Sequence, residues 1–379
     1  MKKSLLSVIL LLLFVLAGCQ SNASNNTNES SAGNDNPNTT LSFKTMADMI
    51  SYVPENDGAI VNLLGFFSMG DGAGGTFYWD ANSGEEHNIG TVVKPESAEK
   101  GRYIRLCDSN LRNVAWFGAN GTDDVDDTNA IQSALTDLKN GGTLVLEPGN
   151  YLLSSSLKID KDGIKLSGRG NVNLVACDAM DGITIIDQAN SVTLTDLNFI
   201  GGNKANHGIL IQGECKGISM KSVFVSEFVS CGLKLSGKIT GGIYEEVNVT
   251  SNAASSSGLS ISGGANDIVF TACRFDMGAF ENCVAGEFNY THDITFQNCT
   301  FTAISSASTG TLFVGGEKEA YPKSLGFYGC DVINVVVNEE HGTIGKNHFF
   351  GFMTHNGQVV PNNDKIFGST DDGRFFGLS

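Results

Sequence analysis

Hydrophobic residues recur at a fixed period through the second half of the chain. Six segments share the order apolar, any, apolar, any, any, apolar or cysteine, any, apolar, and they begin at residues 192, 218, 242, 268, 294 and 325. The segment at 242 is the weakest match because glycine replaces its first aliphatic residue. A repeat of about 25 residues predicts stacked structural units rather than an ordinary globular fold.

A second series of short runs lies in phase with the first. The runs GILIQG, GLKLSG, GLSISG, CVAGEF and TLFVGG begin at residues 208, 232, 258, 283 and 311. Apolar and polar residues alternate in them, which predicts strands with one buried face. Little chain is left between the runs for helices. We therefore expect an all-β stack in which each strand bonds to the coil before and the coil after it.

One helix is predicted in front of this stack. Within residues 129–139, one helical face carries Ile131, Ala134, Leu135 and Leu138. Asp127 or Thr128 suits the N-cap, and the two glycines at 141–142 end the helix. Strands are expected to follow at residues 143–146, 151–153 and 164–166.

Three strings connect this region to a known family. FGANGTDDVDDTNAIQSAL, GGTLVLEPGNYLL and IKLSGRGNVNL, which start at residues 117, 141 and 164, resemble the opening of pectate-lyase-like proteins. That group includes polygalacturonase-related enzymes and phage tailspikes. The resemblance implies a right-handed parallel β-helix over residues 111–379, with the helix at 128–139 capping its open end. GFFSMGDGAGGTFYWD, at residues 65–80, resembles the small β module that precedes such β-helices in tailspike-like proteins, so residues 41–110 are expected to form one.

The first residues predict export. Lys2 and Lys3 precede an apolar run at 5–16, and LAGC at 16–19 resembles a bacterial lipoprotein box. The resemblance implies a signal peptide over residues 1–18 and a lipid anchor on Cys19. The protein would then sit in the bacterial cell envelope, facing outward from the cytoplasmic or outer membrane. A plain signal peptide and an uncleaved anchor are the alternatives. Residues 19–40 contain no aromatic residue and predict a disordered tether.

Charge and cysteine content limit the partners. The formal net charge is −17 and no basic cluster occurs, so we expect no nucleic-acid partner. A polyuronate would need a local basic or calcium-bearing site to overcome this charge. No CxxC pair occurs among the nine cysteines, which argues against a structural zinc site. Cys273, Cys299 and Cys330 share one repeat position, where buried free thiols are favoured over a disulfide ladder.

Enzymes of the resembled family place catalytic carboxylates on outward positions of one sheet. Polygalacturonases carry Asn-Thr-Asp, Asp-Asp, Gly-His-Gly and Arg-Ile-Lys motifs in that order. Here SSSG at 255–258 stands in place of the first motif, and STG at 308–310 stands in place of the third. ENCVA at 281–285 resembles the second motif with Glu281 and Asn282 for its two aspartates, and no Arg-Ile-Lys occurs. The polygalacturonase reaction is therefore not predicted.

Four residues on or near the expected sheet are candidates for catalysis. Glu281 and Glu287 would act as an acid/base pair in glycoside hydrolysis. His207 and Lys234 would supply the base and the cation that a polysaccharide lyase or epimerase needs at a uronate. The alternatives are solvated carboxylates, a turn histidine and a surface lysine.

No cofactor or metal is predicted, although calcium stays open. Asp123, Asp124, Asp126 and Asp127 lack the spacing of an EF-hand, so helix capping and solvation are the simpler interpretation. The sequence thus predicts a surface-anchored carbohydrate-active β-helix protein whose partner is a polysaccharide, acting as a glycoside hydrolase or a lyase. The alternative is a non-catalytic glycan-binding or structural surface β-helix. The oligomeric state is not predicted.

Overall fold

A computed structural model describes residues 40–251, 253–278, 280, 282–303, 312–315 and 323–333, followed by four two-residue strands between 337 and 359. The predicted signal peptide, the predicted lipidation site Cys19 and the predicted tether up to residue 39 lie outside the described residues. No helix in the described part is long and apolar enough to cross a membrane.

The small β module is a five-stranded sheet with its own core. Its elements are β1 (Leu41–Phe43), α1 (Met46–Ile50), β2 (Ile60–Leu63), β3 (Gly75–Asp80), β4 (Val92–Val93) and β5 (Arg102–Arg105), and the strand order is β1-β2-β3-β5-β4. Phe77, Trp79 and Tyr103 are buried in its core. The glycine-rich segment after β2 is a turn, in which Asp71 accepts hydrogen bonds from four backbone N–H groups, those of Phe66, Phe67, Ser68 and Ala73.

The entrance to the β-helix is covered by α2 (Thr128–Asp137), which follows β6 (Leu111–Asn113) and a 3₁₀ turn, η1 (Val114–Phe117). Ile131, Ala134 and Leu135 of α2 are buried in the same core cluster as the first strands. The predicted capping helix is therefore confirmed. It ends at Asp137, two residues earlier than predicted, because Leu138 (φ −76°, ψ 64°) leaves the helical region while its side chain stays buried.

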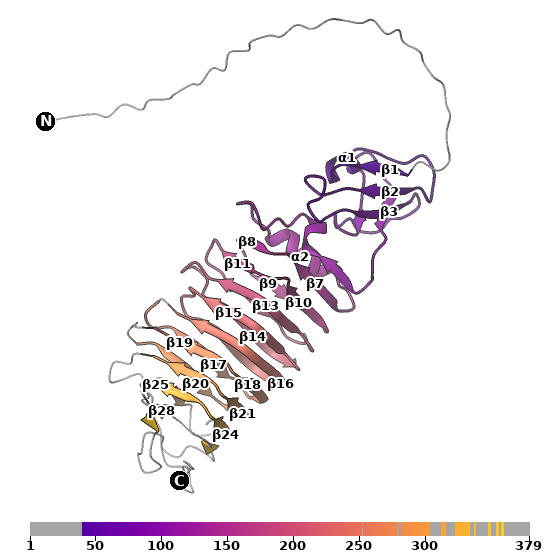
Figure 1. The fold of residues 1–379 in the computed structure, drawn as a ribbon. Coiled ribbons are helices and arrows are strands. Elements are labelled where there is room, and N and C mark those ends of the chain that lie inside the picture. Colours follow the sequence, from indigo (N-terminus) through magenta and orange to yellow (C-terminus); the bar gives the residue numbers. More distant parts are fainter. Residues whose placement is uncertain are drawn as a thin grey trace, which may run out of the picture. The chain divides into compact units, whose positions relative to one another are not determined.

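The rest of the described chain winds into a parallel β-helix, which confirms the predicted fold (Figure 1). Each strand pairs in parallel with strands of adjoining coils, except that β28 and β29 pair antiparallel. The strands are β7 (Gly142–Leu146), β8 (Gly149–Leu153), β9 (Leu157–Ile159), β10 (Ile164–Gly168), β11 (Val172–Ala176), β12 (Ile183–Ile185), β13 (Thr193–Ile200), β14 (His207–Lys216), β15 (Ser219–Ser226), β16 (Cys231–Thr250), β17 (Ser257–Ser262), β18 (Ala265–Thr271), β19 (Arg274–Asp276), β20 (Val284–Asn289), β21 (Thr291–Gln297), β22 (Thr300–Thr302), β23 (Leu312–Gly315), β24 (Lys323–Tyr328), β25 (Asp331–Ile333), β26 (Val337–Asn338), β27 (His348–Phe349), β28 (Thr354–His355) and β29 (Gln358–Val359).

The hydrophobic repeat corresponds to columns of stacked side chains in the core. Tyr244, Phe270, Phe296 and Phe327 are register partners in successive coils. Their ring centroids are 4.6, 4.9 and 4.8 Å apart, close to the spacing of neighbouring strands. Like residues therefore stack on like residues, as the repeat predicts.

The predicted cysteine column is also in the core. Cys273, Cys299 and Cys330 are each 1% exposed. Each thiol donates to a backbone carbonyl of the preceding coil, at Tyr244, Phe270 and Phe296 respectively, over 3.2 to 3.5 Å. Among the described residues no disulfide joins these thiols.

The alignment predicted for the fourth glycine-led run is wrong by two residues. Ser257 is the partner of Val284, so Ala285 lies beside Gly258, and Cys283 precedes the strand as a buried residue. This coil is 27 residues long in the register, whereas the two before it are 24 and 26. The predicted alignment implies 25 residues between Gly258 and its partner, so two more residues than expected precede that partner, and a shift of two does not change the alternation within the strand. The fifth run falls on β23, whose side chains are not described.

Candidate functional site

One sheet of the β-helix gathers the predicted catalytic residues. It contains β12, β14, β16, β17 and β20, which pair in that order. Figure 1 labels β14, β16, β17 and β20 of this sheet. Lys234, Ser260 and Glu287 are register partners on three successive coils. Leu233 and Leu235 on either side of Lys234 are fully buried, so Lys234 points to the outer face of the sheet.

His207 lies between a carboxylate and an ammonium group. Its Nδ1 is 2.7 Å from Asp181 Oδ1, and its Nε2 is 3.4 Å from Lys234 Nζ. Nδ1 is also 3.0 Å from the amide nitrogen of Asn206. We assign the imidazole proton to Nδ1 because the carboxylate oxygen at the shorter distance accepts a hydrogen bond. The lone pair of Nε2 then faces Lys234. We call Asp181, His207 and Lys234 the His207 cluster.

Close backbone packing places Asp181 beside His207. The N–H of Gly182 donates to the carbonyl of His207 over 2.8 Å, and the N–H of Asn206 donates to the carbonyl of Met180 over 2.6 Å. A Cβ on Gly182 would lie 2.2 Å from the carbonyl oxygen of Gly208, so only glycine fits there. The Asn206 amide is 3.4 Å from Asp181 Oδ1 and adds a donor to that carboxylate.

Glu287 lies on the same outer face, two coils from Lys234. Two strand spacings amount to roughly 10 Å. Its carboxylate accepts a hydrogen bond from the amide of Asn289 over 2.9 Å. Burial raises the pKa of the Cys231 thiol to about 12, with the negative charge of Glu287 acting in the same direction and Lys234 opposing it. Both charges are thus near the same thiol.

The four predicted catalytic residues do not all lie together in the described structure. It brings His207 and Lys234 together, places Glu287 nearby, and leaves Glu281 outside the described residues. Their catalytic roles stay predictions. Sequence reasoning missed Asp181, although GITIID at residue 182 is a glycine-led run one coil before GILIQG. Extending the series backwards would have placed Asp181 in the row of His207.

Asp123, Asp126 and Asp127 accept hydrogen bonds from protein donors. Asp126 accepts hydrogen bonds from Thr128 and Ser154. Asp127 is 3% exposed and accepts the backbone N–H of Asn120 over 2.7 Å, and burial raises its pKa to about 6. No group of three or more His, Cys, Asp or Glu side chains in the described part of the chain is arranged to hold a metal ion.

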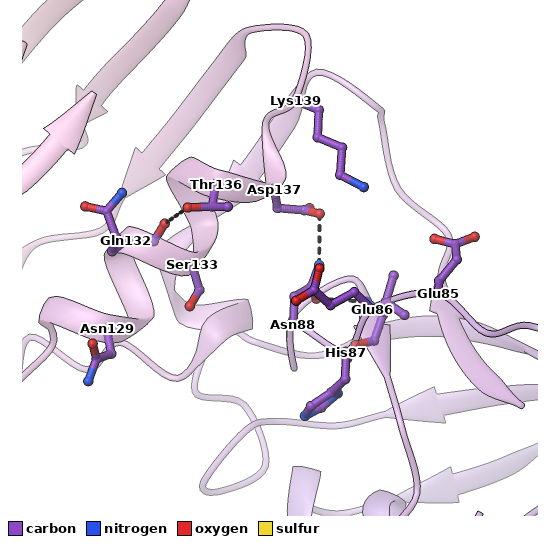
Figure 2. A pocket seen from close by; sticks show the side chains of 11 residues that line it. Glu85, Glu86, His87, Asn88, Asn129, Gln132, Ser133, Thr136, Asp137 and Lys139 are labelled. Carbon is purple, nitrogen blue, oxygen red and sulfur yellow. Dashed lines mark hydrogen bonds between the residues drawn. The ribbon is translucent and has the colours of Figure 1, made fainter. Parts of the chain in front are cut away.

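A cavity of about 340 Å³ lies away from the His207 cluster, between α2 and the loop that precedes β4 (Figure 2). Asp137 forms one wall, where it accepts hydrogen bonds from Asn88 and Thr91 and pairs with Arg112. The residues that line the cavity are Glu85, Glu86, His87, Asn88, Val92, Asn129, Gln132, Ser133, Thr136, Asp137 and Lys139. Its walls share no residue with the predicted catalytic set.

Comparison with known proteins identifies the family. Residues 111–332 match the model of the family described as rhamnogalacturonase A/epimerase, pectate lyase-like. The chain belongs to this family. Residues 42–108 match the small four-stranded β-sheet domain of phage tail proteins, which corresponds to the small β module. No curated protein matches the chain.

Solved structures share the fold of this pectate-lyase-like chain. Tailspike protein gp49 of Acinetobacter baumannii bacteriophage Fri1, described as a capsular polysaccharide depolymerase, matches with a TM-score of 0.64 at 12% identity, covering 86% of this chain and 70% of that one. The enzymatically active domain of bacteriophage CBA120 tailspike protein 2 matches with a TM-score of 0.56 at 15% identity, covering 85% of this chain and 54% of that one. The chain thus spans about half the length of the CBA120 domain. At such identities the likeness shows the fold alone.

Proposed function

We propose that this chain acts on a polysaccharide and that the His207 cluster is its reaction centre. The observation that carries the proposal is that the His207 side chain, which is 10% exposed, lies between the Asp181 carboxylate and the Lys234 ammonium group. A base held by a carboxylate and placed next to a cation suits proton abstraction beside a negatively charged group. The substrate class that fits is a glycan containing uronic acids.

Each residue of the cluster has a distinct part in this reaction. His207 Nε2 takes the proton from the carbon next to the uronate carboxylate, and Asp181 stabilises the imidazolium that forms. Lys234 turns from His207 to the substrate carboxylate, where negative charge develops. The intermediate then either expels the glycosidic oxygen on the adjacent carbon, which takes the proton back from the His207 imidazolium, or is reprotonated on the opposite face by water while the imidazolium returns its proton to solvent. The first outcome is a lyase reaction and the second an epimerisation.

Two-carboxylate hydrolysis is less well supported by the described residues. Asp181 and Glu287 are four coils apart, which amounts to about 19 Å. Paired carboxyl groups in glycosidases lie roughly 5 to 10 Å apart. The pair that the sequence suggested, Glu281 with Glu287, has no described geometry.

The comparisons support a carbohydrate substrate without fixing it. The family description names rhamnogalacturonase and epimerase, and gp49 of phage Fri1 is described as a capsular polysaccharide depolymerase. We further propose that Cys19 anchors the protein by lipid to the bacterial cell envelope, facing outward, where polysaccharides are the accessible polymers.

A substrate screen tests the proposal. Purified residues 41–379 would be incubated with neutral and uronate-containing polysaccharides. Reducing ends would detect hydrolysis, ultraviolet absorbance would detect unsaturated uronates, and proton NMR would detect epimerised residues. We expect a response on a uronate-containing polymer in one of the last two assays. Measurable binding with no turnover on any polymer would favour the non-catalytic alternative.

A further inference from the structure

One row on the sheet of the His207 cluster carries no side chains. Gly213 and Gly237 are register partners, and Gly263 follows in the next coil. All three have positive φ values, of 82°, 142° and 78°. A Cβ on Gly237 would lie 2.3 Å from the Gly213 carbonyl oxygen, and one on Gly263 would lie 2.7 Å from the Gly237 nitrogen. Three coils therefore pack backbone against backbone here. We call the surface formed by Gly213, Gly237 and Gly263 the glycine floor.

Tyr290 stands at the end of this glycine floor. It follows β20 and is 52% exposed. The N–H of Gly264 donates to its carbonyl oxygen over 2.7 Å, and a Cβ on Gly264 would lie 3.5 Å from Cε1 of the ring. The ring thus lies over Gly264. The backbone of Tyr290 has a φ of 47°, which is unfavourable for a residue with a side chain and is held here by the turn.

The glycine floor is on the same surface as the His207 cluster. Tyr290 is three residues beyond Glu287 along the chain, which amounts to roughly 10 Å. A polar row lies between the charged row and the floor, formed by the register partners Gln212, Ser236 and Ser262 and by Asn289 of the next coil. Moving across the sheet, a ligand would meet charged groups, then hydroxyl and amide groups, and then the bare backbone of the glycine floor, with the Tyr290 ring at one end and Asp187 at the other.

This order of surfaces suits a sugar ring. A pyranose has one face of C–H groups, which packs on an aromatic ring, and hydroxyl groups at its rim, which bond to hydroxyl and amide side chains. We propose that Tyr290 and the glycine floor form a binding platform for a pyranose unit of the glycan, beside the reaction centre. The inference rests on the proposed function, because it takes the same polymer to be the ligand.

The test compares variants of the full-length protein that differ in one exposed aromatic ring. Tyr290→Ala removes the ring and Tyr290→Phe keeps it. Tyr328→Ala is the matched control, because Tyr328 is 41% exposed and lies on β24, outside this sheet. Binding of polygalacturonate, alginate, xylan and dextran would be measured by affinity electrophoresis, with the melting temperature of each variant as a check of folding.

For the polymers that the wild type binds, we expect Tyr290→Ala to weaken binding roughly tenfold. Tyr290→Phe and Tyr328→Ala should bind as the wild type does. Unchanged binding by Tyr290→Ala, or an equal loss in Tyr328→Ala, overturns the platform and leaves the proposed function standing. Absence of wild-type binding to all four polymers overturns both. A His207→Gln variant separates the two roles, since it should lose turnover and keep binding.

Discussion

Asp127 is the N-cap residue of α2. It is buried, and among the described residues its Oδ2 has no hydrogen-bond partner. Burial raises its pKa from 3.8 to about 6, against the backbone hydrogen bond from Asn120, which lowers it. Because the folded-state pKa lies above the unfolded value, protonated Asp127 favours folding. This contribution is complete below about pH 4 and is lost as the pH rises through about 6.

Asp127→Asn should therefore change the pH dependence of stability. The amide keeps an acceptor for the Asn120 N–H and does not ionise. Relative to the wild type, we expect the variant to gain about 1 to 3 kcal/mol in free energy of unfolding between pH 4.5 and pH 7.5. Urea denaturation at the two values measures this gain. A difference between variant and wild type that is the same at both pH values would show that Asp127 does not titrate in this range.

The position of a single residue in the fold could be predicted from the sequence where the residue lies in or next to one of the repeated runs. His207 immediately precedes one glycine-led run and Lys234 lies within the next, so the sequence placed them on adjoining coils of one sheet. The contact between them depends on how a long lysine side chain turns along the stack, which the register alone does not give. Asp181 immediately precedes GITIID, which lies one coil before the five runs of the series. The buried position of Asp127 Oδ2 results from tertiary packing, and no pattern in the sequence indicates it.

At the scale of elements, the period of the core residues determined the strands and their stacking. The column of Tyr244, Phe270, Phe296 and Phe327 follows directly from the repeat, because side chains of parallel strands in register lie one above another. The start of β20 was predicted incorrectly because turns between strands vary in length without changing the alternation. The run at 232 and the segment at 242 belong to two separate series in the sequence, but β16 runs unbroken from Cys231 to Thr250 and contains both.

The capping helix should be essential to stability. Leu135 is 3% exposed in the core cluster at the entrance of the β-helix. Leu135→Asp would bury a charge there, and we expect a loss of about 3 to 5 kcal/mol in free energy of unfolding. Thr136→Asp is the control, because the next residue on α2 is exposed and should change stability by less than about 0.5 kcal/mol. Thermal melting of both variants measures the effect, and an unchanged melting temperature for Leu135→Asp would mean that α2 does not close the core.

At the scale of the whole molecule, the sequence predicts a folded region held off a membrane by a tether. The proposed anchor at Cys19 has a direct test in a bacterial host. Cys19→Ser should abolish labelling of the protein by a fatty-acid analogue and should leave the precursor uncleaved before residue 19. Cys107→Ser is a suitable control, since it removes an exposed cysteine of the folded region. Equal labelling of the Cys19→Ser protein and the wild type would contradict the anchor.

The central claim is that the His207 cluster performs chemistry on a glycan. Its most direct test is the initial rate on the polymer identified in the screen, compared between His207→Gln and His292→Gln. His292 is a half-exposed histidine that pairs with Asp293 and lies outside the cluster. We predict that His207→Gln loses activity by roughly 100-fold or more, as expected for removal of a general base, while His292→Gln keeps the wild-type rate. Equal rates for the wild type and both variants would contradict the assignment of the reaction centre.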